Sequence, residues 1–252
     1  MSDPLHLAIL LAAGVAAGFI NTFAGGGSML ALPALMLLGL PADIANGTNR
    51  LAVVTQTIAG VAGFHAEGKL ELRSVPAIAL PTIAGAILGA TAAALWLPRE
   101  WVKPALLATM VLMATVMLVA PRALAPTDGA PQSLRERPVA ALGLFAAGVY
   151  GGFVQAGVGF VLLAVLGGLL RYDLVRANAL KLACVLAFGL ASLAIFVAAD
   201  QVDWAPAVVL ALATVVGARL GVRFAINVRP GTLRVLIFVG VVASAAAAWF
   251  NR

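Results

Sequence analysis

The sequence contains few of the side chains on which enzymes and metal sites depend. Its 252 residues include one cysteine, Cys184, and two histidines, and only 10% of the chain is charged. A single cysteine excludes an intrachain disulfide framework and a cysteine-based metal site. The acidic residues fall in predicted loops or at helix ends, so no buried carboxylate relay for proton pumping is visible. We therefore expect neither enzymatic activity, which needs clustered titratable or metal-binding groups, nor a cofactor.

Hydrophobic residues, by contrast, make up 63% of the chain, against roughly 45–50% in soluble domains. Long apolar stretches lie at about residues 5–40, 46–66, 75–97, 104–120, 139–170, 177–199, 205–226 and 231–249. All but the 104–120 stretch reach about 18 residues, the length expected of a membrane-spanning helix. The sequence thus predicts an all-α polytopic membrane protein whose partner is the lipid bilayer.

The net charge of +6 does not indicate nucleic-acid binding. The basic residues lie mostly at the ends of the predicted helices, where they set topology and meet anionic lipid. No basic run with interleaved aromatic residues is present.

Two halves of the chain resemble one another. Gly25-Gly26-Gly27-Ser28 and Gly157-Val158-Gly159-Phe160 lie 132 positions apart (25 to 157), and each interrupts an apolar run. The same offset aligns Asn46 with Asn178 and holds without a gap over residues 24–98. We predict a first transmembrane repeat over residues 1–120, a polar linker over 121–138 and a second repeat over 139–252.

The number of crossings depends on how the two glycine breaks are counted. If each broken run crosses once, about eight transmembrane helices form two parallel four-helix halves; if both sides of each break cross, there are ten crossings and inverted repeats. At about 1.5 Å per residue, segment 28–40 reaches only about 20 Å, short of the roughly 30 Å hydrocarbon core. We favour eight crossings. This count places the 121–138 linker outside, although its arginines favour the cytoplasmic side.

The breaks are the first candidates for a binding site. Three adjacent glycines, Gly25–Gly27, are expected to interrupt the helix, and Ser28 suits the N-cap of the helix that follows. A helix N-terminus presents free N–H groups and a partial positive charge, which favour an anion. The second break, at Gly157 and Gly159, follows Gln155. Paired breaks in the two halves of a membrane protein are typical of a transporter's binding site.

Polar residues at the start of the following apolar runs are the second group of candidates. Asn46 and Asn49 in the first half align with Asn178 and Lys181 in the second, and Arg50 directly follows Asn49. Amides and a cation about one helical turn apart suit a small oxyanion. The alternative, favoured for Arg50, is an interfacial side chain that reaches toward lipid headgroups. The residues predicted to bind substrate are Asn21, Gly25, Gly26, Gly27, Ser28, Asn46, Thr48, Asn49, Gln155, Gly157, Gly159, Asn178 and Lys181.

Other polar or small residues have simpler interpretations. Gly14 and Gly18 have the spacing of close helix packing in membranes. Arg219 and Arg223 lie on one face of a predicted helix, and we favour topology anchors over substrate contacts for both.

The segment AGFINTFAGGGS (residues 17–28), Pro33, ANGTN (residues 45–49) and Gly63-Phe64 resemble the sulfite exporter TauE/SafE family, also called the sulfonate permease (TSUP) family. The resemblance covers nearly the whole chain, although Val158 stands where a third glycine is usual. It implies four-plus-four helices, a location in the inner membrane and transport of sulfite, sulfonates or other organic anions.

The sequence thus predicts a secondary transporter that moves a small anion, sulfur-containing or organic, across the bacterial cell inner membrane. No Walker motif is present, so this chain is not expected to hydrolyse ATP. A passive anion channel is the alternative, since broken helices also serve channels. The substrate, the direction, the coupling ion and the formation of a homodimer stay open.

Overall fold

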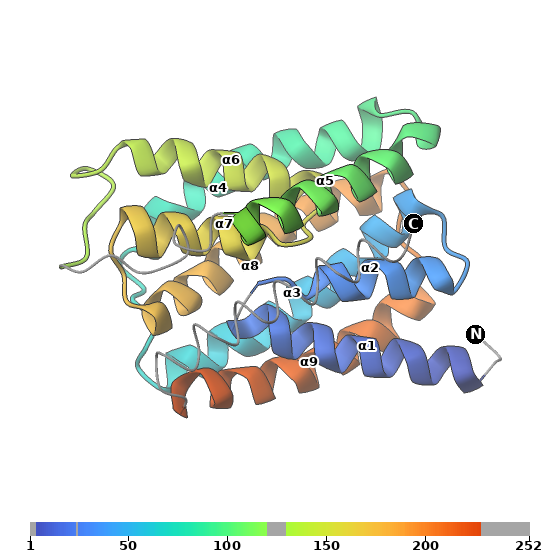
Figure 1. The fold of residues 1–252 in the computed structure, drawn as a ribbon, viewed down its shortest axis with the longest axis horizontal. Helices are drawn as coiled ribbons and strands as arrows, with labels where there is room; N and C mark the ends of the chain where they lie inside the picture. The colour runs from blue at the N-terminus through green and yellow to red at the C-terminus, as the bar shows by residue number, and fades with distance from the viewer. Residues whose placement is uncertain (1–3, 24, 120–129, 228–252) are drawn as a thin grey trace.

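The computed structural model describes residues 4–23, 25–119 and 130–227, and the regular secondary structure of this part of the chain is all helical (Figure 1). The helices are α1 (Pro4–Phe23), α2 (Ser28–Leu37), α3 (Ala42–Ala66), α4 (Val75–Thr91), α5 (Arg99–Val119), α6 (Val139–Phe153), α7 (Val158–Leu163), α8 (Leu174–Ala198) and α9 (Trp204–Asn227). π-helical turns η1 (Ala92–Trp96) and η3 (Ala164–Leu169) continue α4 and α7. The all-α class is as predicted.

Several helices have the length and composition of membrane spans. In the described part of the chain, α1, α4 with η1, α8 and α9 are long and apolar enough to cross a bilayer, and α2, α6 and α7 with η3 are shorter apolar helices. Large apolar side chains such as Leu80, Leu142 and Leu212 are exposed, as expected of a surface that faces lipid. The apolar run at 231–249 and linker residues 121–129 lie outside the described residues.

Helix pairs from different halves pack closely through glycine. A Cβ added at Gly14 of α1 would lie 2.6 Å from Cβ of Ala213 in α9, and one added at Gly221 would lie 2.8 Å from Cβ of Thr22. Residue numbers therefore rise together along α1 and α9, which run parallel. A Cβ at Gly18 would lie only 2.1 Å from a backbone oxygen of α9. The predicted packing role of Gly14 and Gly18 is confirmed.

The long helices α3 and α8 cross the centre of the molecule in opposite directions. A Cβ added at Gly60 of α3 would meet Leu182 of α8, and one added at Gly189 would meet Val54. The 132-residue offset makes α3 equivalent to α8, α1 to α6 and α4 to α9. Because α3–α4 and α8–α9 are joined by short loops, α1, α3 and α9 run one way and α4, α6 and α8 the other (Figure 1). The repeats are thus inverted, and the favoured parallel arrangement is wrong.

The first break accounts for this difference. Gly25 adopts a φ of +98°, and a Cβ added at Gly27 would lie 2.1 Å from the carbonyl oxygen of Ala17. The chain therefore turns back onto α1, and α2 returns toward the end of the molecule from which α1 started (Figure 1). A pair of helices that turns back, such as α1 and α2, contributes no net crossing. The second half therefore starts from the opposite side and runs in the opposite direction to the first.

The polar loops gather at two ends. Loops 67–74, 130–138 and 170–173 meet through hydrogen bonds from Gln132 N to Leu170 O and from the Tyr172 hydroxyl to Ser74 Oγ. The C-terminal part of α9 adjoins Glu67 at the same end, which we call the basic end. It carries Lys69, Arg73, Arg135, Arg137, Arg171, Arg176, Arg219 and Arg223, while the described residues of the opposite end carry Arg99 and Lys103.

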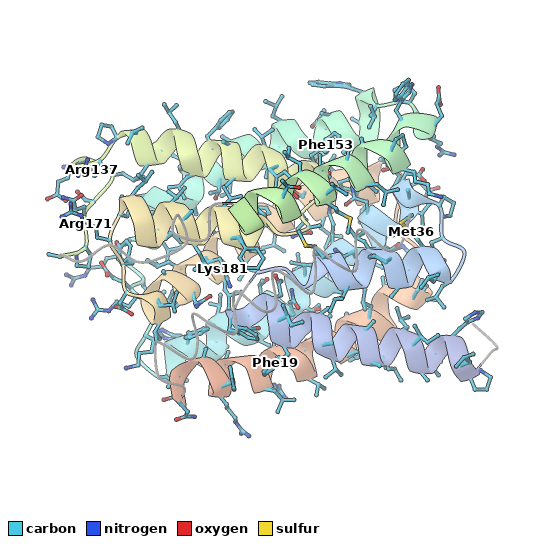
Figure 2. All side chains as sticks on the ribbon, in the orientation of Figure 1. Phe19, Met36, Arg137, Phe153, Arg171 and Lys181 are labelled. Atoms are coloured by element: carbon cyan, nitrogen blue, oxygen red, sulfur yellow. The ribbon has the colours of Figure 1, made fainter. Side chains whose placement is uncertain are left out.

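The positive-inside rule therefore predicts that the basic end faces the cytoplasm. Arg137 of the linker and Arg171 lie together at this end (Figure 2). The crossing count had placed the linker outside because it took the first apolar run as a single span. Because the chain turns back at Gly25, the first apolar run does not form a single span, and the conflict over the side of the linker disappears.

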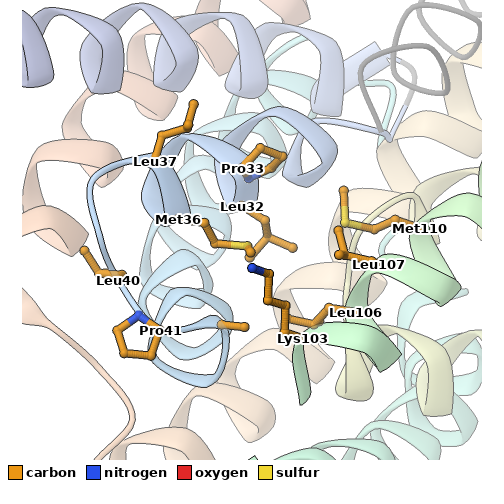
Figure 3. A pocket seen from close by; sticks show the side chains of 11 residues that line it. Leu32, Pro33, Met36, Leu37, Leu40, Pro41, Lys103, Leu106, Leu107 and Met110 are labelled. Atoms are coloured by element: carbon orange, nitrogen blue, oxygen red, sulfur yellow. The ribbon is translucent and has the colours of Figure 1, made fainter. Parts of the chain in front are cut away.

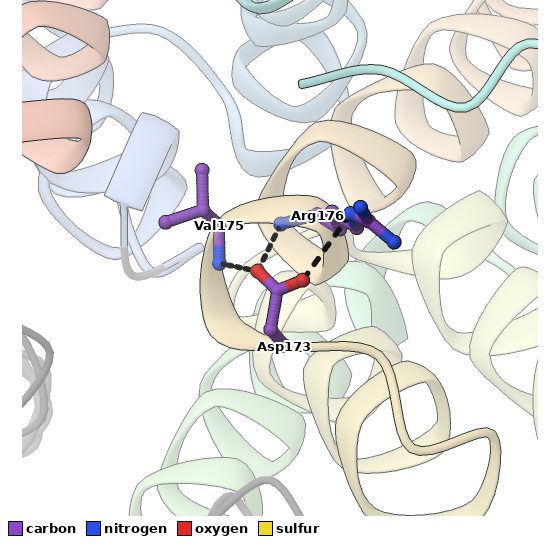
Figure 4. A network of polar contacts seen from close by, with 3 residues as sticks. All are labelled: Asp173, Val175 and Arg176. Atoms are coloured by element: carbon purple, nitrogen blue, oxygen red, sulfur yellow. Dashed lines mark hydrogen bonds and ion pairs between the residues drawn. The ribbon is translucent and has the colours of Figure 1, made fainter. Parts of the chain in front are cut away.

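Helix α8 begins with a side-chain cap at the basic end. The Asp173 carboxylate accepts hydrogen bonds from the backbone N–H groups of Val175, at 3.1 Å, and Arg176, at 3.0 Å (Figure 4). Its other oxygen lies 3.4 Å from Arg176 Nε. This cap fixes the start of α8 and so sets the depth at which Asn178 and Lys181 lie.

Candidate functional site

The two helix breaks touch one another at the centre of the molecule. A Cβ added at Gly25 would lie 2.5 Å from Cα of Gly159, and one added at Gly159 would lie 2.4 Å from Cα of Gly25. Neither position has room for a side chain. Gly157, at the N-cap of α7, adopts a φ of +81° that glycine tolerates best. The structure thus brings the two breaks, predicted from separate halves of the sequence, into one place.

The C-terminal end of α1 is capped by a buried lysine from the other half. Lys181 of α8 is 1% exposed and lies at the centre of the molecule (Figure 2). Its ammonium donates to the carbonyl oxygens of Asn21 at 2.9 Å and Thr22 at 3.0 Å, and to Oδ1 of Asn178 at 2.8 Å. All three ammonium protons are used, and the cation meets the partial negative charge of a helix C-terminus.

The C-terminal end of α6 is capped in the same way by Arg50 of α3. Its guanidinium donates to the carbonyl oxygens of Gly151, at 3.1 Å from Nη1, and of Gly152, and lies 4.3 Å from the centre of the Phe196 ring. Arg50 has no exposed surface. Its interpretation as an interfacial side chain is therefore wrong, because the carbonyls of α6 and the aromatic face provide buried partners that replace water.

An asparagine lies beside each cation, and the 132-residue offset aligns these two asparagines. Asn46 Nδ2 donates to the carbonyl oxygen of Phe153 at 2.9 Å, and its Oδ1 lies 3.5 Å from Arg50 Nη2. Asn178 Oδ1 accepts from Lys181. An amide and a cation on the long helix of each half therefore hold the broken helix of the other half. The cation follows the asparagine by four residues in α3 and by three in α8.

The N-terminal end of α2 faces the same region. Asn49 Nδ2 donates to Ser28 Oγ at 3.0 Å. Ser28 is the first residue of α2, and the N-cap is Gly27, which makes no side-chain cap. The expected capping by Ser28 is thus wrong: the hydroxyl is turned to Asn49 rather than to its own backbone. Within the described residues, the N–H groups of Met29 and Leu30 donate to Gly26 O and Gly27 O, which leaves those of Gly26, Gly27 and Ser28, with the positive dipole end, for a ligand.

Gln155, in the second break, stands out among the polar residues of the site by its backbone conformation and its lack of hydrogen bonds within the described residues. It is 2% exposed and has a φ of +67°. Neither its Oε1 nor its Nε2 has a hydrogen-bond partner among the described residues, and Nε2 lies 4.0 Å from a Cβ added at Gly189. Gln56 Oε1, Ser192 Oγ and Arg50 Nε are also buried and unpaired within the described part. A buried polar atom without a partner costs about 1–3 kcal/mol, so a ligand that pairs with it gains affinity.

The electrostatic balance of the core is positive. Asp43 is the one buried carboxylate in the described ranges; it lies at the start of α3, 3.4 Å from Arg99 Nε. The C-termini of α1 and α6 supply roughly half a negative charge each against the full charges of Arg50 and Lys181, which leaves about one positive charge. An anion is the ligand that such a site would favour.

Some predicted residues lie elsewhere, and some central ones were missed. The Thr48 hydroxyl accepts from the backbone N–H of Asp203 at 3.0 Å, at the end opposite to the basic end. Phe196 and Ser192 were not candidates, Gln56 was not among the residues predicted to bind substrate, and Arg50 was assigned to the interface. The four-residue spacing from Asn46 to Arg50 was the available signal for Arg50, since it places both on one helix face.

Two cavities lie away from the breaks. One, of about 310 Å³, is lined by α2, the start of α3 and α5, and is apolar except for Lys103 (Figure 3). The other, of about 260 Å³, lies between the C-terminal parts of α3 and α9, where Arg219 and Arg223 line it near Glu67. Neither cavity contains a residue of the predicted binding site.

Comparison with known proteins agrees with the resemblance seen in the sequence. The family model described as sulfite exporter TauE/SafE matches residues 10–248. The chain belongs to the TauE/SafE family. This TauE/SafE protein is 25% identical over 236 residues to a "Probable membrane transporter protein" of Haemophilus influenzae, covering 92% of this chain and 90% of the relative.

Two further relatives have similar names. "Probable membrane transporter protein ORF9" of Sinorhizobium is 27% identical over 241 residues, with 95% of this chain and 90% of the relative covered. "Probable membrane transporter protein YfcA" of Escherichia coli K12 is 26% identical over 249 residues, with 97% and 90% covered. These bacterial relatives are named as membrane transporters rather than enzymes, and this TauE/SafE chain is a multi-pass membrane protein of the same family.

Proposed function

We propose that this TauE/SafE protein is a secondary transporter that moves a small oxyanion, such as sulfite or a sulfonate, across the bacterial cytoplasmic membrane. The observation that carries the proposal is the pair of fully buried cations, Arg50 and Lys181, beside the contact of the two helix breaks. An uncompensated charge in a low-dielectric core is costly, so a bound anion would stabilise the site.

The proposed contacts divide into donors and supports. The backbone N–H groups of Gly26, Gly27 and Ser28, the Asn49 amide and the unpaired Gln155 amide are the donors that would face the anion, while the N–H of Gly25 is bonded to Ile20 O. Gly157 and Gly159 shape the second side of the site. The residues that hold the helix ends are Asn46, Asn178 and Lys181, and the Asn21 carbonyl is one of the groups that Lys181 holds. We leave Thr48 out because its hydroxyl is engaged far from the breaks.

The inverted repeats suit alternating access. The α1–α2 pair reaches the centre from the end opposite to the basic end, and the α6–α7 pair reaches it from the basic end (Figure 1). Rocking of one pair against the other would open the central site to one side of the membrane at a time. A transporter built in this way binds its substrate where the pairs meet.

Flux through proteoliposomes tests the proposal. Purified protein is reconstituted, and uptake of labelled sulfite and of a panel of sulfonates is followed with and without unlabelled anion inside. Saturable uptake and counterflow support a carrier, whereas uptake without saturation or counterflow indicates the channel alternative. If no oxyanion moves under a proton gradient or a membrane potential, the substrate class is wrong.

The unpaired amide offers a residue-level test. Gln155→Glu keeps the shape of the side chain but adds a negative charge, so the apparent affinity for the anion should fall at least tenfold. Gln132→Glu, the same exchange in the linker loop at the basic end, is the matched control and should retain the affinity. Equal affinities in the two variants would remove Gln155 from the proposed site.

A further inference from the structure

Only one of the two cations that cap the broken helices can give up its proton. Lys181 holds α1, and an ammonium can become a neutral amine. Arg50 holds α6, and a guanidinium stays protonated in proteins. We propose that Lys181 carries the proton that couples anion transport to the proton gradient, and that its deprotonation after the anion has left weakens the hold of α8 on α1 while α6 stays held. This inference rests on the proposed transport function.

The geometry shows why loss of the proton matters at this position. The Lys181 ammonium donates three hydrogen bonds to three oxygens, two of them backbone carbonyls of α1. A neutral amine has two N–H groups and a lone pair, so one of the three oxygens must lose its donor and the lone pair must face an oxygen. The charge-assisted character of the remaining bonds is also lost. The end of α1 is then free to move relative to α8.

In the part of the chain that the structure describes, the surroundings of Lys181 contain no carboxylate that could take its proton. Among the described elements, those that make the main contacts with α8 are α1, α3, α4, α6, α7 and η3. The charged or titratable groups on these elements and on α8 itself are His6, Asp43, Arg50, His65, Tyr150, Arg176 and Cys184. Asp43 pairs with Arg99 at the start of α3, and the Tyr150 hydroxyl donates to the carbonyl oxygen of Ala156. Water that enters the opened site is therefore the proton acceptor.

Charge balance sets the direction of coupling. With the anion bound, a protonated Lys181 compensates its charge; without the anion, the positive charge of the core is uncompensated and the neutral amine is favoured. The loaded protein therefore carries the anion with one proton on Lys181 Nζ, and the empty protein returns without either. The proton is taken from water on the side where the anion binds and is released to water on the side where it leaves. Anion and proton thus move together, in equal numbers.

The experiment measures both fluxes in the same proteoliposomes. The interior holds a pH-sensitive dye, and an inward gradient of labelled sulfite, or of whichever sulfonate the flux panel identifies, is imposed. The wild-type protein should acidify the interior by about one proton per anion beyond the protein-free control. Lys181→Arg, which keeps the charge and the donors but cannot release a proton, should lose the coupled acidification, measured as the number of protons that enter per anion. Lys103→Arg, the same exchange in the cavity between α2 and α5, should behave as the wild type.

The outcomes separate this inference from the proposed function. Anion uptake by the wild type without accompanying protons would overturn the role of Lys181 and leave the transport function standing. Acidification by Lys181→Arg equal to that of the wild type would also overturn it. If no anion moves, the proposed function itself fails, and the coupling fails with it. Anion uptake without protons in the wild type overturns the inference even if the variant does not fold.

Discussion

The contact between the two breaks makes a sharp prediction about alanine substitutions. Gly159→Ala adds a Cβ 2.4 Å from Gly25 Cα, where real Cβ atoms are not found, so backbone must shift. Overpacking of this kind costs about 1–3 kcal/mol. Gly25→Ala brings the same overlap and also forces alanine to a φ of +98°, which adds about 1–2 kcal/mol. We expect losses of unfolding free energy of about 1–3 kcal/mol for Gly159→Ala and about 2–5 kcal/mol for Gly25→Ala.

Gly39 provides the matched control for backbone strain alone. It has a φ of +89°, close to that of Gly25, and no described atom within 4 Å of an added Cβ. Gly39→Ala should therefore lose only the strain contribution of about 1–2 kcal/mol and keep transport. Equilibrium unfolding of the three variants in mixed micelles, together with counterflow in proteoliposomes, measures both quantities. If Gly159→Ala is as stable and as active as the wild type, the breaks do not touch as described and the central site is wrong.

The remaining predictions concern the donor end of α2, the topology and a loop carboxylate. Asn49→Ala removes the hydrogen bond to the first residue of α2, so the half-saturating anion concentration in the flux assay should rise, and stability should fall by about 1 kcal/mol. In a protein without its native cysteine, Arg137→Cys should react with an impermeant thiol reagent only from the cytoplasm and Asp200→Cys only from outside, because they lie at opposite ends. The backbone N–H and hydroxyl of Ser133 lower the pKa of Glu136, so this contact stabilises the loop above the ordinary pKa of a glutamate and is lost as pH falls through the lowered value. A titration of Glu136 by NMR should therefore give a higher pKa in Ser133→Ala.

Much of the architecture could be predicted from local patterns in the sequence. The apolar runs, the glycine breaks and the 132-residue offset are properties of short segments, and the structure places helices, interruptions and equivalent elements accordingly. The packing role of Gly14 and Gly18 followed from their spacing alone. Such features depend on residues close together in sequence, which is why the pattern was sufficient.

The orientation of the halves could not be predicted in the same way. It depends on whether α2 continues the direction of α1 or reverses it, and this is decided by the positive φ of Gly25 and by the contact of Gly27 with Ala17. A run of three glycines permits both conformations. One such turn in each half changes the number of membrane crossings in that half between even and odd. The side of the membrane on which the linker lies changes with it.

The role of Arg50 was missed for a related reason. Its hydrogen-bond acceptor on Gly151 lies 101 positions away in the sequence, so no local pattern reveals it. An arginine near the start of an apolar run has the same local appearance whether it reaches lipid headgroups or caps a distant helix. Only the packing of α3 against the end of α6 distinguishes the two.

The helix breaks explain both the positions of the two buried cations and the binding of the anion that the protein is proposed to carry. Interrupting an apolar helix creates two ends of opposite polarity within a few residues: carbonyl groups at the end of α1 and N–H groups at the start of α2. The carbonyl end is satisfied by Lys181, supplied by the other half of the protein. The N–H end receives no anionic side chain, because the buried part of the described chain holds no carboxylate near it. The second half repeats the arrangement with Arg50 at the end of α6. Arg50 therefore neutralises its acceptor end permanently, and Lys181 does so reversibly. The donor ends stay available to an anion that binds and dissociates.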